Sequence, residues 1–252
     1  MIINVFSPLD QFEIILLKPL FLFGLLDMSI TNITVYSFVV LFSFCFIFYF
    51  SFYILGLIPN RWQYSIESIY NFIMDIMRQQ IGTKGQPYFP VLFLVFIFIL
   101  FANLIGMTPF GFTLTSHIII TLLIGFSIFL GITLIGILRL KLHFIDLFFP
   151  GEGLPKFLVP AIVFVEVLSY TIRPFSISIR LFANIMAGHT LLTILSQLTY
   201  SLFRTKFWLG LLPFVIIFAV TCLELFIACL QAYVFTILLA IYFNDALSGS
   251  SH

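Results

Sequence analysis

The sequence predicts an all-α, polytopic membrane protein, because its composition is strongly apolar and its charged residues leave long gaps along the chain. Hydrophobic residues make up 62% of the 252 residues and charged residues only 8%, and the mean hydropathy is +1.21. A soluble domain carries roughly a quarter charged residues, and single soluble cores stop growing near this length. We therefore expect one membrane domain over 1–252, with five membrane-embedded helices and one amphipathic surface helix.

The gaps between charged residues place the elements. No charged residue occurs between Asp27 and Arg61 or within 85–138, and glycine, proline and polar residues divide the second gap into spans at about 88–107 and 116–138. In chain order we expect an N-terminal segment (1–30), a transmembrane helix (37–58) and an amphipathic surface helix (61–80). A transmembrane hairpin (88–138) and a longer helical hairpin (157–243) follow.

The surface helix is predicted from its periodicity. Apolar residues recur at helical spacing between charged ones, namely Ile66, Ile69, Tyr70, Ile73 and Met77. An amphipathic helix between two spans is expected to lie along the membrane surface.

The last two apolar stretches, 157–203 and 207–243, are too long for upright membrane helices. At 1.5 Å per residue they would measure roughly 70 Å and 55 Å, whereas the hydrocarbon core is about 30 Å thick. Ordinary tilts of about 20° do not absorb this excess. We therefore expect a hairpin that lies steeply inclined in the bilayer.

Basic residues predict the orientation. With five crossings, the links 59–86 and 139–157 fall on the same side as the C-terminus, and each holds three basic residues. The opposite side holds two, Arg204 and Lys206. Because basic residues are enriched in inner loops, the C-terminus is expected inside and the N-terminus outside.

Ionisable residues within the last two stretches are candidate functional residues, because each costs at least about 2.5–3.5 kcal/mol near the bilayer centre. Glu166, Arg173 and Arg180 follow one another at intervals of seven and form one helical stripe, which Asn184 extends by one turn. His189 lies nine residues past Arg180 and therefore on roughly the opposite face.

The second long helix carries Glu224 and Gln231 on one face, and Asp245 at its end. Small residues at helical spacing, such as Ala228 and Ala232, let membrane helices approach closely. An acid on this helix and a histidine on the other could then meet.

Structural interpretations of these groups stay open on the residues alone. Arg173 and Glu166 could form an internal ion pair, and Asp245 could be a solvated helix end. Arg180 could snorkel, but it lies far from either helix end. His189 could be a satisfied core histidine, whereas Glu224 is hard to explain by packing alone.

Several functions lack their sequence signatures. We find no phosphate-binding glycine-rich loop, no HExxH, no paired CxxC and no nucleophile elbow. The three cysteines show neither metal-ligand spacing nor a disulfide framework. We therefore expect no cofactor, no metal and no nucleotide site, and the net charge of +1 gives no indication of nucleic acid.

Five segments resemble subunit a of F-type ATP synthases. Residues 180–189, Arg-Leu-Phe-Ala-Asn-Ile-Met-Ala-Gly-His, carry the most specific motif, and similar motifs occur at 101–109, 115–117 and 224–235. The opening 7–14, Ser-Pro-Leu-Asp-Gln-Phe-Glu-Ile, is similar to the mitochondrial and alphaproteobacterial start of that family.

The resemblance implies a stator subunit of the Fo sector in a proton-transporting ATP synthase, with no catalytic site of its own. Two offset half-channels would load and unload protons on the carboxylates of a rotor ring of c subunits. The implied partners are this c-ring, the peripheral stalk, other Fo membrane subunits, lipid and protons. The implied location is the mitochondrial inner membrane, with the N-terminus toward the intermembrane space; an alphaproteobacterial plasma membrane is the alternative.

The resemblance also implies residue roles. Arg180 matches the stator arginine that faces the rotor, and His189 with Glu224 matches the pair of the outer half-channel, in the mitochondrial order. Polar residues that line the same outer path are matched by Asn184, Gln231 and Asp245. Glu166 matches the acid near the matrix half-channel, and Arg173 matches a second arginine.

Two other classes compete with this interpretation. A subunit of a redox-driven pump or a secondary transporter usually shows internal repeats or interrupted helices, and the sequence has neither. A purely structural membrane subunit would have no reason to hold Arg180 in the middle of a span.

Overall fold

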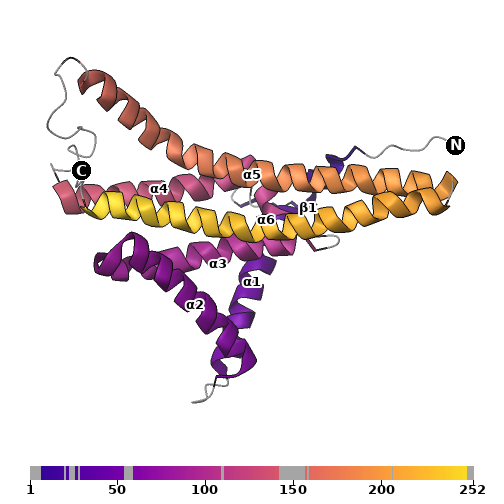
Figure 1. The fold of residues 1–252 in the computed structure, drawn as a ribbon, viewed down its shortest axis with the longest axis horizontal. Helices are drawn as coiled ribbons and strands as arrows, with labels where there is room; N and C mark the ends of the chain where they lie inside the picture. Colours follow the sequence, from indigo (N-terminus) through magenta and orange to yellow (C-terminus); the bar gives the residue numbers. More distant parts are fainter. Residues whose placement is uncertain are drawn as a thin grey trace. The chain divides into compact units, whose positions relative to one another are not determined.

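Six α-helices form most of the structure, a computed structural model that describes residues 7–19, 21–22, 26–27, 29–53, 59–108, 111–141, 157, 159–205 and 207–248. The helices are α1 (Asn32–Tyr53), α2 (Arg61–Gln80), α3 (Phe89–Gly106), α4 (Ile118–Leu140), α5 (Val159–Thr205) and α6 (Phe207–Ser248) (Figure 1). The described residues also form short 3-10 helices: η1 (Asp10–Phe12) precedes α1, η2 (Gly82–Tyr88) connects α2 to α3, and η3 (Leu114–Ser116) lies between α3 and α4.

Two short antiparallel ladders lie before α1. Strand β1 (Leu16–Lys18) pairs with β4 (Ile30–Thr31), and β2 (Phe21–Leu22) pairs with β3 (Leu26–Asp27). The sequence analysis predicts no strands in this segment. Ladders of two or three residues carry too little periodicity to be recognised from a sequence.

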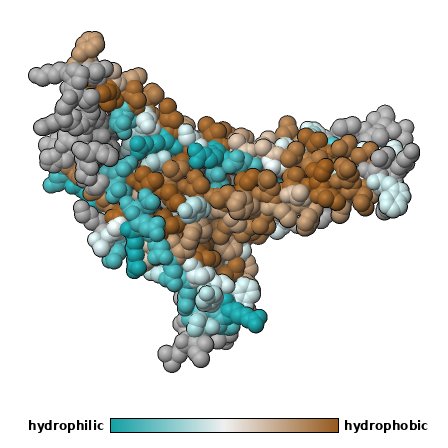
Figure 2. Space-filling view, viewed as in Figure 1, coloured by the Kyte–Doolittle hydropathy of each residue, from teal (hydrophilic) through white to brown (hydrophobic). Residues whose placement is uncertain are grey.

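The all-α membrane class is confirmed. Five of the described helical segments are long and apolar enough to cross a bilayer. The sixth helix, α2, runs from Arg61 to Gln80 as predicted, and the side chain of Asn60 accepts a hydrogen bond from the Arg61 amide at its start. Hydrophilic side chains gather along α2, whereas apolar side chains cover much of the visible surface of the long helices (Figure 2). The position of α2 on a membrane surface stays a prediction.

Helix α1 begins at Asn32 rather than at residue 37. Polar side chains satisfy backbone groups at this end, since the Thr34 hydroxyl accepts from the Thr31 amide and donates to the Thr31 carbonyl. The last residues of the predicted span, 54–58, lie outside the described residues.

The two long helices are continuous. They meet in each unit, through His189 and Glu224 in one and through Arg173 and Asp245 in the other, and the order of these pairs is antiparallel. Helix α5 has 47 residues and α6 has 42, with Pro174 and Pro213 inside them. At 1.5 Å per residue these lengths correspond to roughly 70 Å and 63 Å. Both exceed a hydrocarbon core of about 30 Å, and the steep inclination that follows from this excess stays a prediction.

The chain divides into two compact units. The first, unit 1, comprises Met1–Phe46, Phe98–His117 and Leu181–Gln231, and unit 2 comprises Ile47–Ile97, Ile118–Arg180 and Ala232–His252.

A buried side-chain hydrogen-bond network centred on Asn103 lies in unit 1. Asn103 is fully buried, its amide oxygen accepts from the Thr115 hydroxyl at 3.0 Å, and its amide nitrogen donates to the Ala228 carbonyl at 3.4 Å. Because a buried amide without partners is costly, these bonds fix η3, α3 and α6 against one another. Val40, Ala102 and Leu114 form an apolar cluster in the same unit.

Loop residue His117, between η3 and α4, packs beside the Phe112 ring, with ring centroids 5.3 Å apart. Burial lowers the pKa of His117 from its usual value of 6.5. The imidazole is therefore mostly neutral at pH 7.

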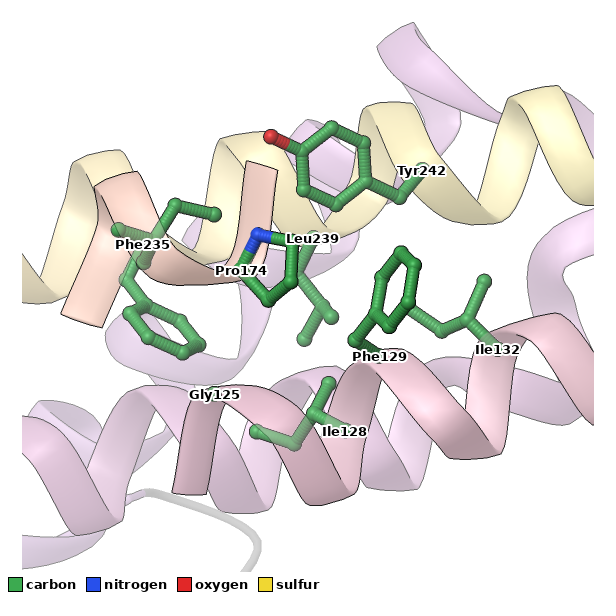
Figure 3. Close-up of a pocket in the computed structure, with 9 residues that line it drawn as sticks. Gly125, Ile128, Phe129, Ile132, Pro174, Phe235, Leu239 and Tyr242 are labelled. Carbon is green, nitrogen blue, oxygen red and sulfur yellow. The ribbon is translucent and has the colours of Figure 1, made fainter. Parts of the chain in front are cut away.

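Unit 2 is held together where α4 meets α5 and α6. Its apolar side chains leave a cavity of only about 10 Å³ (Figure 3), lined by Gly125, Ile128, Phe129, Ile132, Pro174, Ile177, Phe235, Leu239 and Tyr242. A Cβ atom at Gly125 would overlap the Ser178 hydroxyl oxygen and would lie 3.3 Å from the Pro174 carbonyl oxygen. Any side chain at position 125 would therefore have to displace Ser178 or move α4 away from α5.

We expect Gly125→Ala to destabilise unit 2 by about 1–3 kcal/mol, the usual cost of overpacking a well-filled core. Gly131→Ala is the matched control, because Gly131 lies on the same helix and a Cβ atom there would have no neighbour within 4 Å. The measurement is the thermal unfolding of the purified complex that contains each variant. Equal midpoints for the two variants would contradict the close helix contact.

Candidate functional site

His189 on α5 and Glu224 on α6 form an acid–imidazole pair in unit 1. The Nε2 atom of His189 lies 3.5 Å from Oε1 of Glu224, and the side chains are 16% and 4% exposed. Gly188 permits this approach, because a Cβ there would lie 2.7 Å from Oε1 of Glu224. A side chain at the preceding position would therefore displace the Glu224 carboxyl group.

The acid–imidazole pair borders a cleft of about 400 Å³. Its lining is partly polar and comes from the N-terminal segment, the α3–η3 connection, α5 and α6: Gln11, Gly106, Met107, Thr108, Gly111, Phe112, His189, Leu192, Thr221 and Glu224. Neither carboxyl oxygen of Glu224 takes part in a hydrogen bond with the residues that the structure describes. A carboxyl group buried beside an imidazole at such a cleft can exchange a proton with either neighbour.

Asn184 and Gln231 meet on the same helix pair. The Asn184 amide nitrogen donates to the Gln231 side-chain oxygen at 3.2 Å. Gln231 is buried and Asn184 is exposed. Ala228 and Ala232 on α6 are fully buried, and residues this small allow membrane helices to approach one another closely.

Arg173 joins α5 to α6 in unit 2. Its guanidinium donates to Oδ2 of Asp245 at 3.0 Å and lies 3.8 Å from Oε1 of Glu166. The same group lies 5.2 Å from the ring centroid of Tyr242 and 5.7 Å from that of Tyr170, which is cation–π distance. Asp245 is thus the nearer of the two acidic partners, although the sequence suggests only Glu166.

Arg180 is exposed on α5. Among the described residues it forms no ion pair, in contrast to Arg173 in the same unit. Its neighbour Ile179 is 48% exposed and apolar. A permanent positive charge therefore lies at an apolar helix surface without an acidic partner from the described part of the chain.

The structure brings together His189 with Glu224, Asn184 with Gln231, and Arg173 with Glu166 and Asp245. Sequence reasoning missed Gly188, Gln11 and Asn103. The position of Gly188 next to His189 is a usable signal, since a glycine inside a helix often marks a close contact. No local signal points to Gln11, because its partner is distant in the sequence.

The family model described as ATP synthase A chain matches residues 32–244. The chain is similar to "ATP synthase subunit a" of Acanthamoeba castellanii, with 49% identity over 247 residues that cover 98% of this chain and 99% of that protein. It is also similar to "ATP synthase subunit a" of Marchantia polymorpha, with 45% identity over 249 residues that cover 96% of this chain and 98% of that protein.

We expect Arg173 and Asp245 to be energetically coupled. Arg173→Gln, Asp245→Asn and the double variant should give a coupling free energy of about 1 kcal/mol in a thermal-unfolding cycle, because each single change breaks the same contact. The matched cycle of Arg173 with Glu166→Gln should give a smaller value, because that contact is longer and Glu166 is more exposed. Equal coupling in the two cycles would contradict the assignment of Asp245 as the main partner.

Proposed function

Because the chain belongs to the ATP synthase A chain family, we propose that it is the stator subunit a of the Fo sector and forms two offset proton half-channels against a rotor ring. The family serves ATP synthesis and proton transport in a membrane. The rotor ring consists of c subunits, each with a membrane-embedded carboxyl group. Nucleotide chemistry belongs to other subunits.

The single observation that carries the proposal is the state of Arg180. Its charge is exposed at an apolar helix surface and has no ion-pair partner among the described residues. Burial in lipid without a counter-charge costs several kcal/mol. The carboxylate of a rotor subunit is a partner with the charge and the location that this side chain requires.

Arginine suits this role because it does not release its proton in a protein. It therefore blocks direct proton passage between two water-accessible paths. Its charge also stabilises the ionised form of a rotor carboxyl group that faces it. Once a proton neutralises that carboxylate, the rotor subunit can move into lipid.

The cleft beside His189 and Glu224 is the outer half-channel in this proposal. A proton passes by way of Glu224 and His189 to the rotor, since histidine exchanges protons near physiological pH. Asn184 and Gln231 continue the polar lining on the same helix pair.

Glu166 belongs to the inner half-channel, where protons leave, and Arg173 holds the carboxylates of Glu166 and Asp245 in place. Each proton that crosses delivers roughly 2.3 kcal/mol per 100 mV. Several protons are therefore needed for each ATP. The peripheral stalk and other Fo subunits keep the stator from rotating with the ring.

The location in this proposal is the mitochondrial inner membrane, with the N-terminus toward the intermembrane space and the C-terminus toward the matrix. Two findings support it: the basic residues of the predicted inner loops, and relatives from an amoeba and a liverwort, which are organisms with mitochondria.

Arg180→Ala should abolish ATP-driven proton pumping in the complex reconstituted in liposomes. ATP hydrolysis by the detached catalytic head should continue, because the substitution lies outside the head. The control is Ile179→Ala, a change of the exposed neighbour on α5, which should leave pumping intact. Normal pumping by the Arg180→Ala complex would rule out the stator role.

Gly188→Ala should slow proton transport by up to about a hundredfold, the loss that a displacement of about 1 Å causes at a reacting group. The new methyl group pushes the Glu224 carboxyl away from His189, while alanine favours the helix itself. Assembly should therefore survive. Gly131→Ala makes the same chemical change in open space and should transport normally. Unchanged transport in Gly188→Ala would show that the pair does not carry protons.

A further inference from the structure

We propose that the N-terminal strap, defined as residues 7–15, forms the mouth of the outer half-channel and that Gln11 and Phe12 are positioning residues for His189. The proposal rests on the proposed function and extends it to a part of the chain outside the membrane helices. Gln11 lines the same cleft as His189 and Glu224, although it lies at the opposite end of the sequence.

The contact between the strap and α5 runs through Thr193. The Gln11 amide nitrogen donates to the Thr193 hydroxyl at 3.2 Å. This hydroxyl in turn donates to the backbone carbonyl of His189, one turn earlier on α5. The Phe12 ring stands edge-on to the imidazole, with ring centroids 6.4 Å apart and an interplanar angle of 84°. Two adjacent strap residues thus contact the segment that holds His189.

The strap has its own anchors, so it does not depend on these contacts for its shape. Asp10 accepts a hydrogen bond from the Ser7 amide at the start of η1. Farther along, the Asn32 side chain accepts from the Ile15 amide and donates to the Glu13 carbonyl, and its backbone amide donates to the Ile15 carbonyl. The strap is therefore fixed to the start of α1 at one end and reaches α5 near His189.

Two separate arguments place this mouth on the outer side. Basic residues in the loops predict an outer N-terminus, and His189 with Glu224 belongs to the outer half-channel in the proposed function. Because Gln11 contacts Thr193, the N-terminal strap and the His189 segment must lie on the same side of the membrane. Both arguments assign the outer side.

The first test labels the mouth in the complete ATP synthase complex in liposomes. In a background with Cys45, Cys222 and Cys229 replaced by alanine, Gln11→Cys is treated with a charged, membrane-impermeant methanethiosulfonate, and ATP-driven pumping is measured before and after labelling. Leu9→Cys is the matched control, because Leu9 is 53% exposed on the same strap but does not line the cleft.

We expect labelling of Gln11→Cys to abolish pumping, and labelling of Leu9→Cys to leave it unchanged. The proposal is overturned if Gln11→Cys is fully labelled, as judged by mass spectrometry, and still pumps. It is also overturned if position 11 does not react, or if the label at position 9 inhibits equally.

The second test distinguishes positioning from simple packing. Gln11→Ala and Thr193→Val should each slow proton conduction about two- to tenfold, the factor that one ordinary hydrogen bond supports, and each should move the pH midpoint of conduction. The double variant should lose no more than either single variant, because both changes break one chain of contacts. Additive losses, or an unmoved midpoint, would overturn the positioning role.

These outcomes are separable from those for the proposed function. Pumping by the Arg180→Ala complex would reject the stator role whatever the strap variants do. If that complex fails to pump and the strap variants behave as the parent does, only the strap proposal is rejected.

Discussion

Contact between α5 and α6 is the constraint on which the described structure depends, because an ionisable pair joins the two helices in each unit. His189 meets Glu224 in unit 1, and Arg173 meets Asp245 in unit 2. A charge without a partner is costly in lipid, and each of these pairs supplies a partner from the neighbouring helix. Small residues make the approach possible, with buried alanines on α6 and Gly188 on α5.

Arg180 is the exception, because it has no ion-pair partner among the described residues. The first arginine of the stripe, Arg173, contacts two carboxylates and two aromatic rings. Arg180 follows it at the helical repeat, yet has no such partner among the described residues. Two chemically identical side chains on one helix therefore differ in their surroundings: Arg173 pairs with acids of this chain, whereas Arg180 is the side chain that the proposed function pairs with a rotor carboxylate.

The apolar runs and charge gaps predicted the helices well, because the length of a span is set by the bilayer and is visible in any window of about 20 residues. The ionisable candidates were visible for the same reason. The sequence could not show that Asp245 is nearer to Arg173 than Glu166 is, since this depends on how α6 is rotated against α5. Asn103 and Gly188 were missed because a buried amide tie and a missing Cβ leave no periodic pattern. The ladders before α1 were too short to predict.

The hydrogen bond between Gln11 and Thr193 spans 182 residues of sequence, and this separation has a consequence for biogenesis. During translation the strap is made well before its partner on α5, which lies 182 residues farther along the chain. Gln11 can therefore reach Thr193 only after most of α5 has been synthesised. The acid–imidazole pair likewise forms only once α6 has been synthesised, because Glu224 follows His189 in the chain.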